Sequence, residues 1–314
     1  MSHNRKILPF ALSISAWCAY ISITAVAADP YQKDQIPEKA YRQMLRARDE
    51  RLRNDTDESV RKLERIVKDY PNYFLAHYNL GLSYQALNKL DDAMRELVEA
   101  SKLNESLALH EPTIDNALGS LYLTMGRYPE ALAELKSAAS PANVRKLDPD
   151  SKRKIFNNVG LAYSHLSESC EADIFYELGR RAAQTATEAG ESKNLTGTWI
   201  VQQWQPLNGK QFLDFDFPSS TGALRIGDRN PEGTYDGDFT ICIHVRNVGT
   251  RVVRERMTVK GDGSVVILIG RVFEDAGLKW ADDQISATES GYTLLGSGLD
   301  TRGTRTTLRF EKIL

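Results

Sequence analysis

Histidine and cysteine are scarce in this chain, which has five histidines and three cysteines in 314 residues. The sequence also lacks a C-x-x-C pair, an H-E-x-x-H motif and any cluster of cysteine with histidine. Zinc sites in proteins usually draw their ligands from such patterns. We therefore expect no metal centre, and no motif indicates a cofactor.

An excess of charge of one sign is also lacking. The 40 basic and 42 acidic side chains give a net charge of −2. Proteins whose main partner is nucleic acid need a basic surplus or a basic stripe, so this class of function is disfavoured. Arginines do gather in one region, which we interpret as a solvated β-ribbon face, with a patch for an acidic partner as the alternative. These arginines are Arg246, Arg251, Arg254, Arg256 and Arg271.

Signatures of enzymes are missing as well. There is no glycine-rich phosphate loop and no G-x-S-x-G motif. His244 alternates with apolar neighbours in a predicted strand, so we expect it to be exposed or to line a barrel, and the sequence indicates no partner for it. Carboxylate pairs occur, but we interpret them as exposed strand or turn residues. These pairs are Asp214/Asp216, Asp236/Asp238 and Asp282/Asp283. We expect a non-enzymatic protein, and a cleft gathering Asp214, Asp216, Asp238 or His244 would favour an enzyme instead.

The N-terminus has the pattern of an export signal. Arg5 and Lys6 precede an uncharged apolar stretch over residues 7–28, which ends in the small-residue motif Ala25-Val26-Ala27. Such a segment predicts a signal peptide over residues 1–27 and a periplasmic or secreted protein with no membrane span in the mature chain. An uncleaved membrane anchor is the alternative.

Two cysteines follow the predicted signal, at Cys170 and Cys242. Export would permit a disulfide between them. Because they lie in different predicted domains, we favour two buried free thiols.

A helical repeat occupies the middle of the chain. Three residues with fixed spacing occur together three times. They are Leu or Val, the Gly that follows it, and a Tyr three residues after the Gly. Nine residues after each Tyr comes an Ala, and four residues later a bulky apolar residue. The copies are Leu80-Gly81/Tyr84/Ala93/Leu97, Leu118-Gly119/Tyr122/Ala131/Leu135 and Val159-Gly160/Tyr163/Ala172/Tyr176.

This spacing resembles the tetratricopeptide repeat family, which implies a solenoid of antiparallel helical hairpins. We place clear copies at residues 74–107, 112–145 and 153–186. A degenerate unit precedes them, with helices expected at 37–53 and 58–70. The predicted domains are a helical N-terminal segment at 28–57 and helical repeats at 58–190.

The C-terminal part, residues 191–314, changes to strand periodicity. Seven or eight short strands separated by Gly-containing turns predict an antiparallel all-β domain, either a barrel or a sandwich. We expect strands at 199–204, 212–217, 239–245, 251–259, 265–273, 284–288, 292–295 and 304–313. The fold class is thus multidomain, α then β. The segment from Leu195 to Trp199 is similar to the Gly-x-Trp opening strand of lipocalin-like barrels, which implies a barrel with Arg309 or Arg305 across the Trp199 ring.

The resemblance to tetratricopeptide repeats also implies a binding site on the concave face formed by the first helix of each repeat. The matching positions are neutral and rich in amides, which offer both a donor and an acceptor to a peptide backbone. They are Tyr78, Asn79 and Leu82, then Asn116, Ser120 and Thr124, then Asn157, Asn158 and Leu161.

Three functions follow as hypotheses. The first is an exported adaptor or scaffold that binds a protein or peptide in this groove. The second is a carrier or sensor of a small apolar ligand in the β-domain, with the repeats as a docking arm; a filled barrel interior would argue against it. The third is an envelope enzyme with its site in the β-domain.

Overall fold

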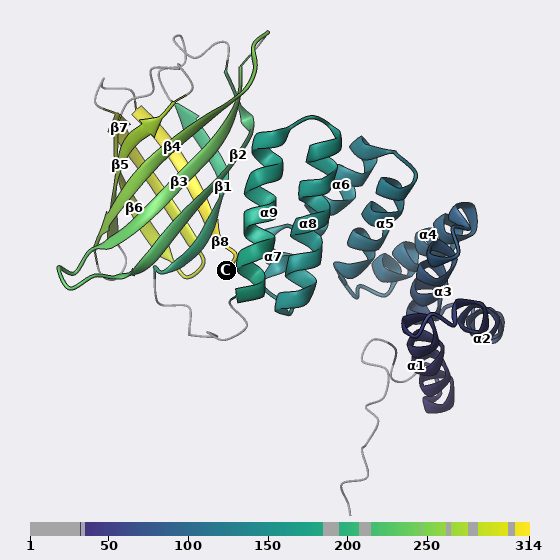
Figure 1. Ribbon diagram of the computed structural model, residues 1–314. Coiled ribbons are helices and arrows are strands. Elements are labelled where there is room, and N and C mark those ends of the chain that lie inside the picture. The colour runs from purple at the N-terminus through teal and green to yellow at the C-terminus, as the bar shows by residue number, and fades with distance from the viewer. Residues whose placement is uncertain are drawn as a thin grey trace, which may run out of the picture.

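The computed structural model describes residue 32 and residues 35–184, 195–206, 215–245, 247–261, 265–275, 282–300 and 305–314. Helices occupy the described chain up to Gln184, and strands follow from Gly197 (Figure 1). This order confirms the predicted change from α to β. The predicted signal peptide, residues 1–27, lies outside the described residues.

The helices form consecutive antiparallel hairpins: α1 with α2, α3 with α4, α5 with α6, and α8 with α9. No helix among the described residues is both long enough and apolar enough to cross a membrane. Their bounds are α1 Glu38–Leu52, α2 Thr56–Asp69, α3 Phe74–Ala86, α4 Leu90–Ser106, α5 Thr113–Thr124, α6 Tyr128–Ala138, α7 Pro141–Val144, α8 Pro149–His165 and α9 Ser169–Gln184.

Each repeated glycine lies where the two helices of its hairpin touch. A Cβ on Gly81 would lie 2.6 Å from Leu97 Cγ, and a Cβ on Gly119 would lie 2.5 Å from Leu135 Cγ. In the third copy, a Cβ on Gly160 would lie 2.9 Å from the Tyr176 ring. The same two repeat positions therefore meet in all three hairpins, which explains why the sequence keeps a glycine opposite a bulky residue.

The strands form one closed antiparallel barrel in sequence order, with β1 paired to both β2 and β8. The structure thus resolves the choice between barrel and sandwich. The bounds are β1 Gly197–Pro206, β2 Phe215–Arg229, β3 Tyr235–Val245, β4 Gly249–Lys260, β5 Val265–Glu274, β6 Asp283–Ser290, β7 Thr293–Asp300 and β8 Arg305–Lys312. The strand expected at 212–217 overlaps the start of the longer β2 at residues 215–217, its first three residues lie outside the described residues, and the second half of β2 was not predicted from the sequence.

Apolar side chains from all eight strands fill the described part of the barrel interior. Trp199 and Phe239 are fully buried there, and the ring of Phe239 meets that of Phe310 edge-on at 5.7 Å between centroids. The prediction that Arg309 or Arg305 covers Trp199 is wrong. Side chains along β8 point alternately into and out of the barrel, and both arginines are on the outward, exposed side. The residue opposite Trp199 is Lys312, whose Nζ lies 5.6 Å from the centroid of the Trp199 ring.

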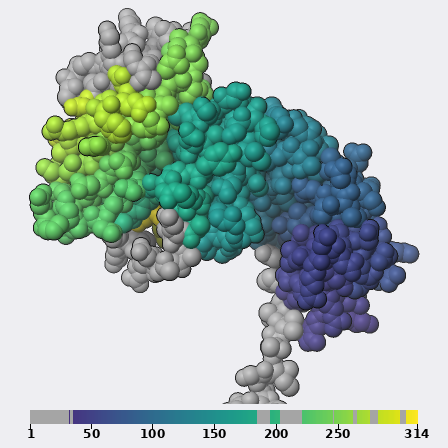
Figure 2. Space-filling view, in the orientation of Figure 1, coloured from purple at the N-terminus to yellow at the C-terminus, as the bar shows by residue number. Residues whose placement is uncertain are grey.

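The last helices pack directly on the barrel (Figures 1 and 2). One apolar core continues from α6, α7, α8 and α9 to the outer face of the barrel, where it includes Ile200, Cys242 and Ile313. Arg145 adds polar contacts: Nη1 donates to the Lys312 carbonyl at 3.2 Å, and the guanidinium lies 4.9 Å from the Tyr292 ring centroid. The helical array and the barrel therefore share a continuous interface.

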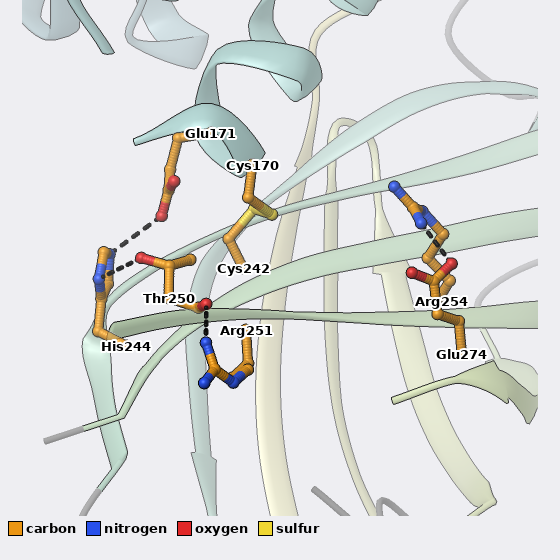
Figure 3. The surroundings of a disulfide bond; sticks show 8 residues. All are labelled: Cys170, Glu171, Cys242, His244, Thr250, Arg251, Arg254 and Glu274. Atoms are coloured by element: carbon orange, nitrogen blue, oxygen red, sulfur yellow. Dashed lines mark hydrogen bonds and ion pairs between the residues drawn. A yellow bond between two sulfur atoms is a disulfide. The ribbon is translucent and has the colours of Figure 1, made fainter. Parts of the chain in front are cut away.

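A disulfide crosses this interface. Cys170 at the start of α9 is bonded to Cys242 on β3, with a Cα–Cα distance of 6.0 Å (Figure 3). The prediction of two free thiols is therefore wrong. It assumed that residues in separate domains stay apart, whereas α9 lies against β2, β3 and β4.

Candidate partner-binding face

The first helices of successive hairpins lie side by side. Contacts run from α1 to α3, from α3 to α5 and from α5 to α8, so these four helices share one side of the array. We call this side the first-helix face. It is the place where the sequence predicted partner-binding residues.

Polar side chains link α3 to α5 on this face. Gln85 donates from Nε2 towards Ser120 Oγ at 3.2 Å and Thr124 Oγ1 at 3.3 Å. Thr124 also donates to the Ser120 carbonyl at 3.0 Å. Two predicted site residues, Ser120 and Thr124, are therefore brought together, and Gln85, which the sequence did not single out, joins them.

A second amide contact continues the row from α5 to α8. Asn158 Nδ2 donates to Asn116 Oδ1 at 3.0 Å, and both side chains are half-buried. The five residues Gln85, Asn116, Ser120, Thr124 and Asn158 are referred to below as the polar row. The row carries no formal charge, so it has no means to select a charged group.

Apolar side chains predicted for the site have different degrees of exposure. Leu161 on α8 is 40% exposed, although it is a large apolar residue. Leu82 is half-buried against the core of the N-terminal hairpins. Tyr78 is also half-buried, with its ring 6.2 Å from that of Phe74; burial raises the pKa of its hydroxyl, which bonds to Thr113. Leu161 is thus the most accessible of the three.

Two of the predicted asparagines have their side chains engaged within the fold. Asn79 is buried and donates from Nδ2 to the Leu75 carbonyl at 2.8 Å and to Met44 Sδ at 3.4 Å. Asn157 packs against α9, where its Oδ1 lies 2.2 Å from the position that a Cβ on Gly179 would take. Both residues therefore contribute to packing between helices.

Two of the carboxylates considered for an enzyme are engaged in structural contacts, and Asp283, expected to be exposed, is buried. Asp238 forms an ion pair with Arg225 at 3.3 Å, and Asp282 accepts a hydrogen bond from the Val272 backbone N–H at 2.9 Å. Asp214 lies outside the described residues, as does the side chain of Asp216.

His244 has a partner that the sequence did not reveal. It lies on the outer face of the barrel, and its Nε2 is 3.1 Å from Glu171 Oε1 on α9 (Figure 3). Its Nδ1 is 3.0 Å from Thr250 Oγ1. The partner belongs to the helical part of the chain, 73 residues earlier, so the strand pattern around His244 contains no signal for it.

The arginine cluster is only partly paired among the described residues. Arg254 forms an ion pair with Glu274, and Arg251 donates to the Thr250 carbonyl at 3.0 Å. Arg256 and Arg271 are exposed and directly opposite each other on β4 and β5. Arg246 lies outside the described residues.

No protein-family model matches the chain, and no curated protein matches it. Among solved structures, PilF of Pseudomonas aeruginosa is 20% identical with a TM-score of 0.42, and the match covers 47% of this chain and 63% of PilF. BtubC from P. vanneervenii is 17% identical with a TM-score of 0.42, covering 50% of this chain and 68% of BtubC. MamA from MSR-1 is 19% identical with a TM-score of 0.37, covering 49% of this chain and 83% of MamA. The chain thus spans less than two thirds of the PilF chain, and at these scores the matches assign no function.

Proposed function

We propose that this chain is a non-enzymatic adaptor that binds an extended segment or a helix of another protein along the first-helix face. The observation that carries the proposal is the polar row, which runs without a charge across α3, α5 and α8. Three neighbouring hairpins thereby present one continuous set of hydrogen-bonding groups.

The polar row suits recognition of a peptide backbone. Each amide in it can donate and accept, as a backbone requires. In the free protein these groups bond to one another between neighbouring helices. A hydrogen bond of this kind contributes only about 0.5–1.5 kcal/mol net, so a peptide can replace it without a large penalty. Leu161 offers an apolar contact at the α8 end of the row.

The two alternative functions receive less support. A carrier of an apolar ligand needs an empty barrel interior, whereas side chains such as Trp199, Phe239 and Phe310 occupy the described part of it. An enzyme needs titratable groups free to react, whereas Asp238 forms an ion pair with Arg225 and the His244 ring contacts the Glu171 carboxylate.

We also propose that the chain is exported. The signal-like N-terminus supports export to an oxidising compartment, where disulfides persist. The bond between Cys170 and Cys242 is the structural feature that fits this location.

Site-specific photo-cross-linking tests the adaptor proposal. A photo-reactive amino acid replaces Ser120 in the polar row, and in a matched control it replaces Lys102, an exposed residue of α4. After irradiation in the native host, a defined protein should be linked to the Ser120 site and not to the Lys102 site. Equal labelling at both sites, or labelling at neither, would contradict the proposal.

A further inference from the structure

Three potential metal ligands meet where the helical array joins the barrel. Glu168 precedes α9, Glu171 is in its first turn, and His244 is on β3. One carboxylate oxygen from each glutamate and one ring nitrogen of His244 all lie within 4.8 Å of one another. Figure 3 shows Glu171 pointing from the helix towards His244 on the strand.

The environment of Glu171 is incomplete without a further group. Its side chain is 0% exposed, and neither carboxylate oxygen has a hydrogen-bond partner among the described residues. Its contact with His244 is an ion pair only if the ring is protonated. A buried carboxylate is costly unless a cation or several donors compensate its charge.

His244 is oriented as a metal ligand would be. Its Nδ1 lies 3.0 Å from Thr250 Oγ1, so this hydroxyl oxygen can accept a hydrogen bond from Nδ1–H. Nε2 then directs its lone pair at Glu171, an arrangement that repels the carboxylate and attracts a cation between them. Histidines that bind metals commonly have their second nitrogen held by such a hydrogen bond.

One pair of these ligands has the spacing that a small transition-metal ion requires. Ligands about 2.0–2.1 Å from a tetrahedral ion are about 3.3 Å apart. The distance between His244 Nε2 and Glu171 Oε1 is 3.1 Å, close to that value. Two carboxylates and a neutral imidazole also balance a charge of +2. Calcium prefers an all-oxygen shell, so the imidazole favours zinc-like ions.

We propose that Glu168, Glu171 and His244 bind one divalent transition-metal ion of the zinc class at the joint between the helical array and the barrel. The cysteines beside them are joined to each other, so they are not ligands. With the disulfide, the ion would form a second link between α9 and β3. No zinc motif is visible in the sequence because the ligands are brought together only by docking of the two parts of the chain.

Calorimetric titration with ZnCl₂ tests this proposal. The full chain, carrying Cys18→Ser so that only the disulfide-bonded cysteines remain, is stripped with a chelator, dialysed, and shown by a thiol assay to have no free cysteine, which excludes thiolate ligands. We expect one equivalent of Zn²⁺ to bind, with weaker binding of Ca²⁺. Absence of stoichiometric Zn²⁺ binding, or binding of Ca²⁺ as tight as that of Zn²⁺, would overturn the proposal.

Variants distinguish this site from adventitious binding. Glu171→Gln and His244→Gln should each remove the stoichiometric binding, whereas His165→Gln, which changes an exposed histidine of α8, should leave it intact. Thr250→Val preserves all three ligands and should weaken binding about 10–100-fold through the histidine orientation. Far-UV circular dichroism checks that each variant is folded. Retention of full affinity in folded His244→Gln would overturn the assignment, as would loss of binding in His165→Gln.

Discussion

Replacing Gly119 with alanine should destabilise the protein, although alanine is the better helix former. The new Cβ would lie 2.5 Å from Leu135 Cγ and 2.8 Å from Leu135 Cδ2. Leu135 is 0% exposed and has no room to withdraw. Overpacking of this kind costs about 1–3 kcal/mol, and the helix propensity of alanine returns about 1 kcal/mol. We expect a net loss of up to about 2 kcal/mol in the free energy of unfolding.

The reason for this loss can be isolated by a second substitution. Leu135→Ala alone should cost about 2–5 kcal/mol because it leaves a cavity. In that background the atoms that clash with the new Cβ are gone, so Gly119→Ala should no longer destabilise the protein. Gly126→Ala serves as the control: that residue has φ +73° and nothing within 4 Å of an added Cβ. Gly126→Ala should lower the free energy of unfolding by about 1–2 kcal/mol through its backbone conformation alone. This loss should be the same with and without Leu135→Ala.

Urea unfolding followed by the helical circular-dichroism signal measures these differences. The reasoning predicts a coupling free energy between Gly119→Ala and Leu135→Ala of at least about 1 kcal/mol, and none between Gly126→Ala and Leu135→Ala. If Gly119→Ala costs the same with and without the Leu135 side chain, the close contact is not the reason for the glycine.

Two further predictions concern stability. Replacing Cys170 and Cys242 with serine opens a loop with a sequence separation of 72, and the chain-entropy relation gives such a cross-link about 4 kcal/mol. In urea unfolding, the free energy of unfolding of the double variant should therefore be lower than that of the oxidised parent by up to that amount. An unchanged midpoint would contradict this prediction. The second concerns the buried pair of His77 Nδ1 and Glu96 Oε2, 2.9 Å apart. Burial alone would lower the pKa of His77 and raise that of Glu96. Their mutual hydrogen bond and charge attraction outweigh burial together with the Pro71 carbonyl beside His77 and Arg95 beside Glu96, so the pKa of His77 is raised and that of Glu96 is lowered. The contribution of His77 to the free energy of unfolding is fully present below about pH 6.5 and is lost as pH rises through its raised pKa. The contribution of Glu96 is fully present above about pH 4.5 and is lost as pH falls through its lowered pKa. The difference in unfolding free energy between the parent and His77→Gln should therefore be largest between these values, and a difference that grows towards alkaline pH would refute the assignment.

Local patterns in the sequence were sufficient for the main elements. The repeated Gly and the bulky residue opposite it fixed the helical hairpins, because that contact lies within one hairpin. Period-two alternation indicated the strands, and turn glycines separated them. The second half of β2 was missed because Gly222 and Gly227 interrupt its apolar pattern.

Contacts between distant parts of the chain could not be predicted in the same way. The disulfide, the His244–Glu171 pair and the position of Lys312 over Trp199 depend on how the barrel closes or how α9 docks on it. No local pattern encodes either event.

The candidate site shows the same limit at the level of single residues. Asn79 and Asn158 occupy equivalent repeat positions, two residues after His77 and Phe156 respectively. Each faces the first helix of the preceding hairpin. Asn79 is covered there by Met44 of α1, whereas Asn158 meets Asn116 of α5. The repeat alignment gives the direction of the side chain, but the neighbouring helix decides whether it stays available.

The affinity of the cross-linked partner for the purified chain tests the central claim most directly. The dissociation constant is compared for the parent, the double variant Asn116→Ala/Asn158→Ala and the control Lys102→Ala, after circular dichroism confirms that all are folded. Loss of two hydrogen bonds of about 0.5–1.5 kcal/mol each predicts binding weaker by about 5- to 150-fold in the double variant and unchanged in the control. Equal affinity in the parent and the double variant would contradict partner binding through the first-helix face.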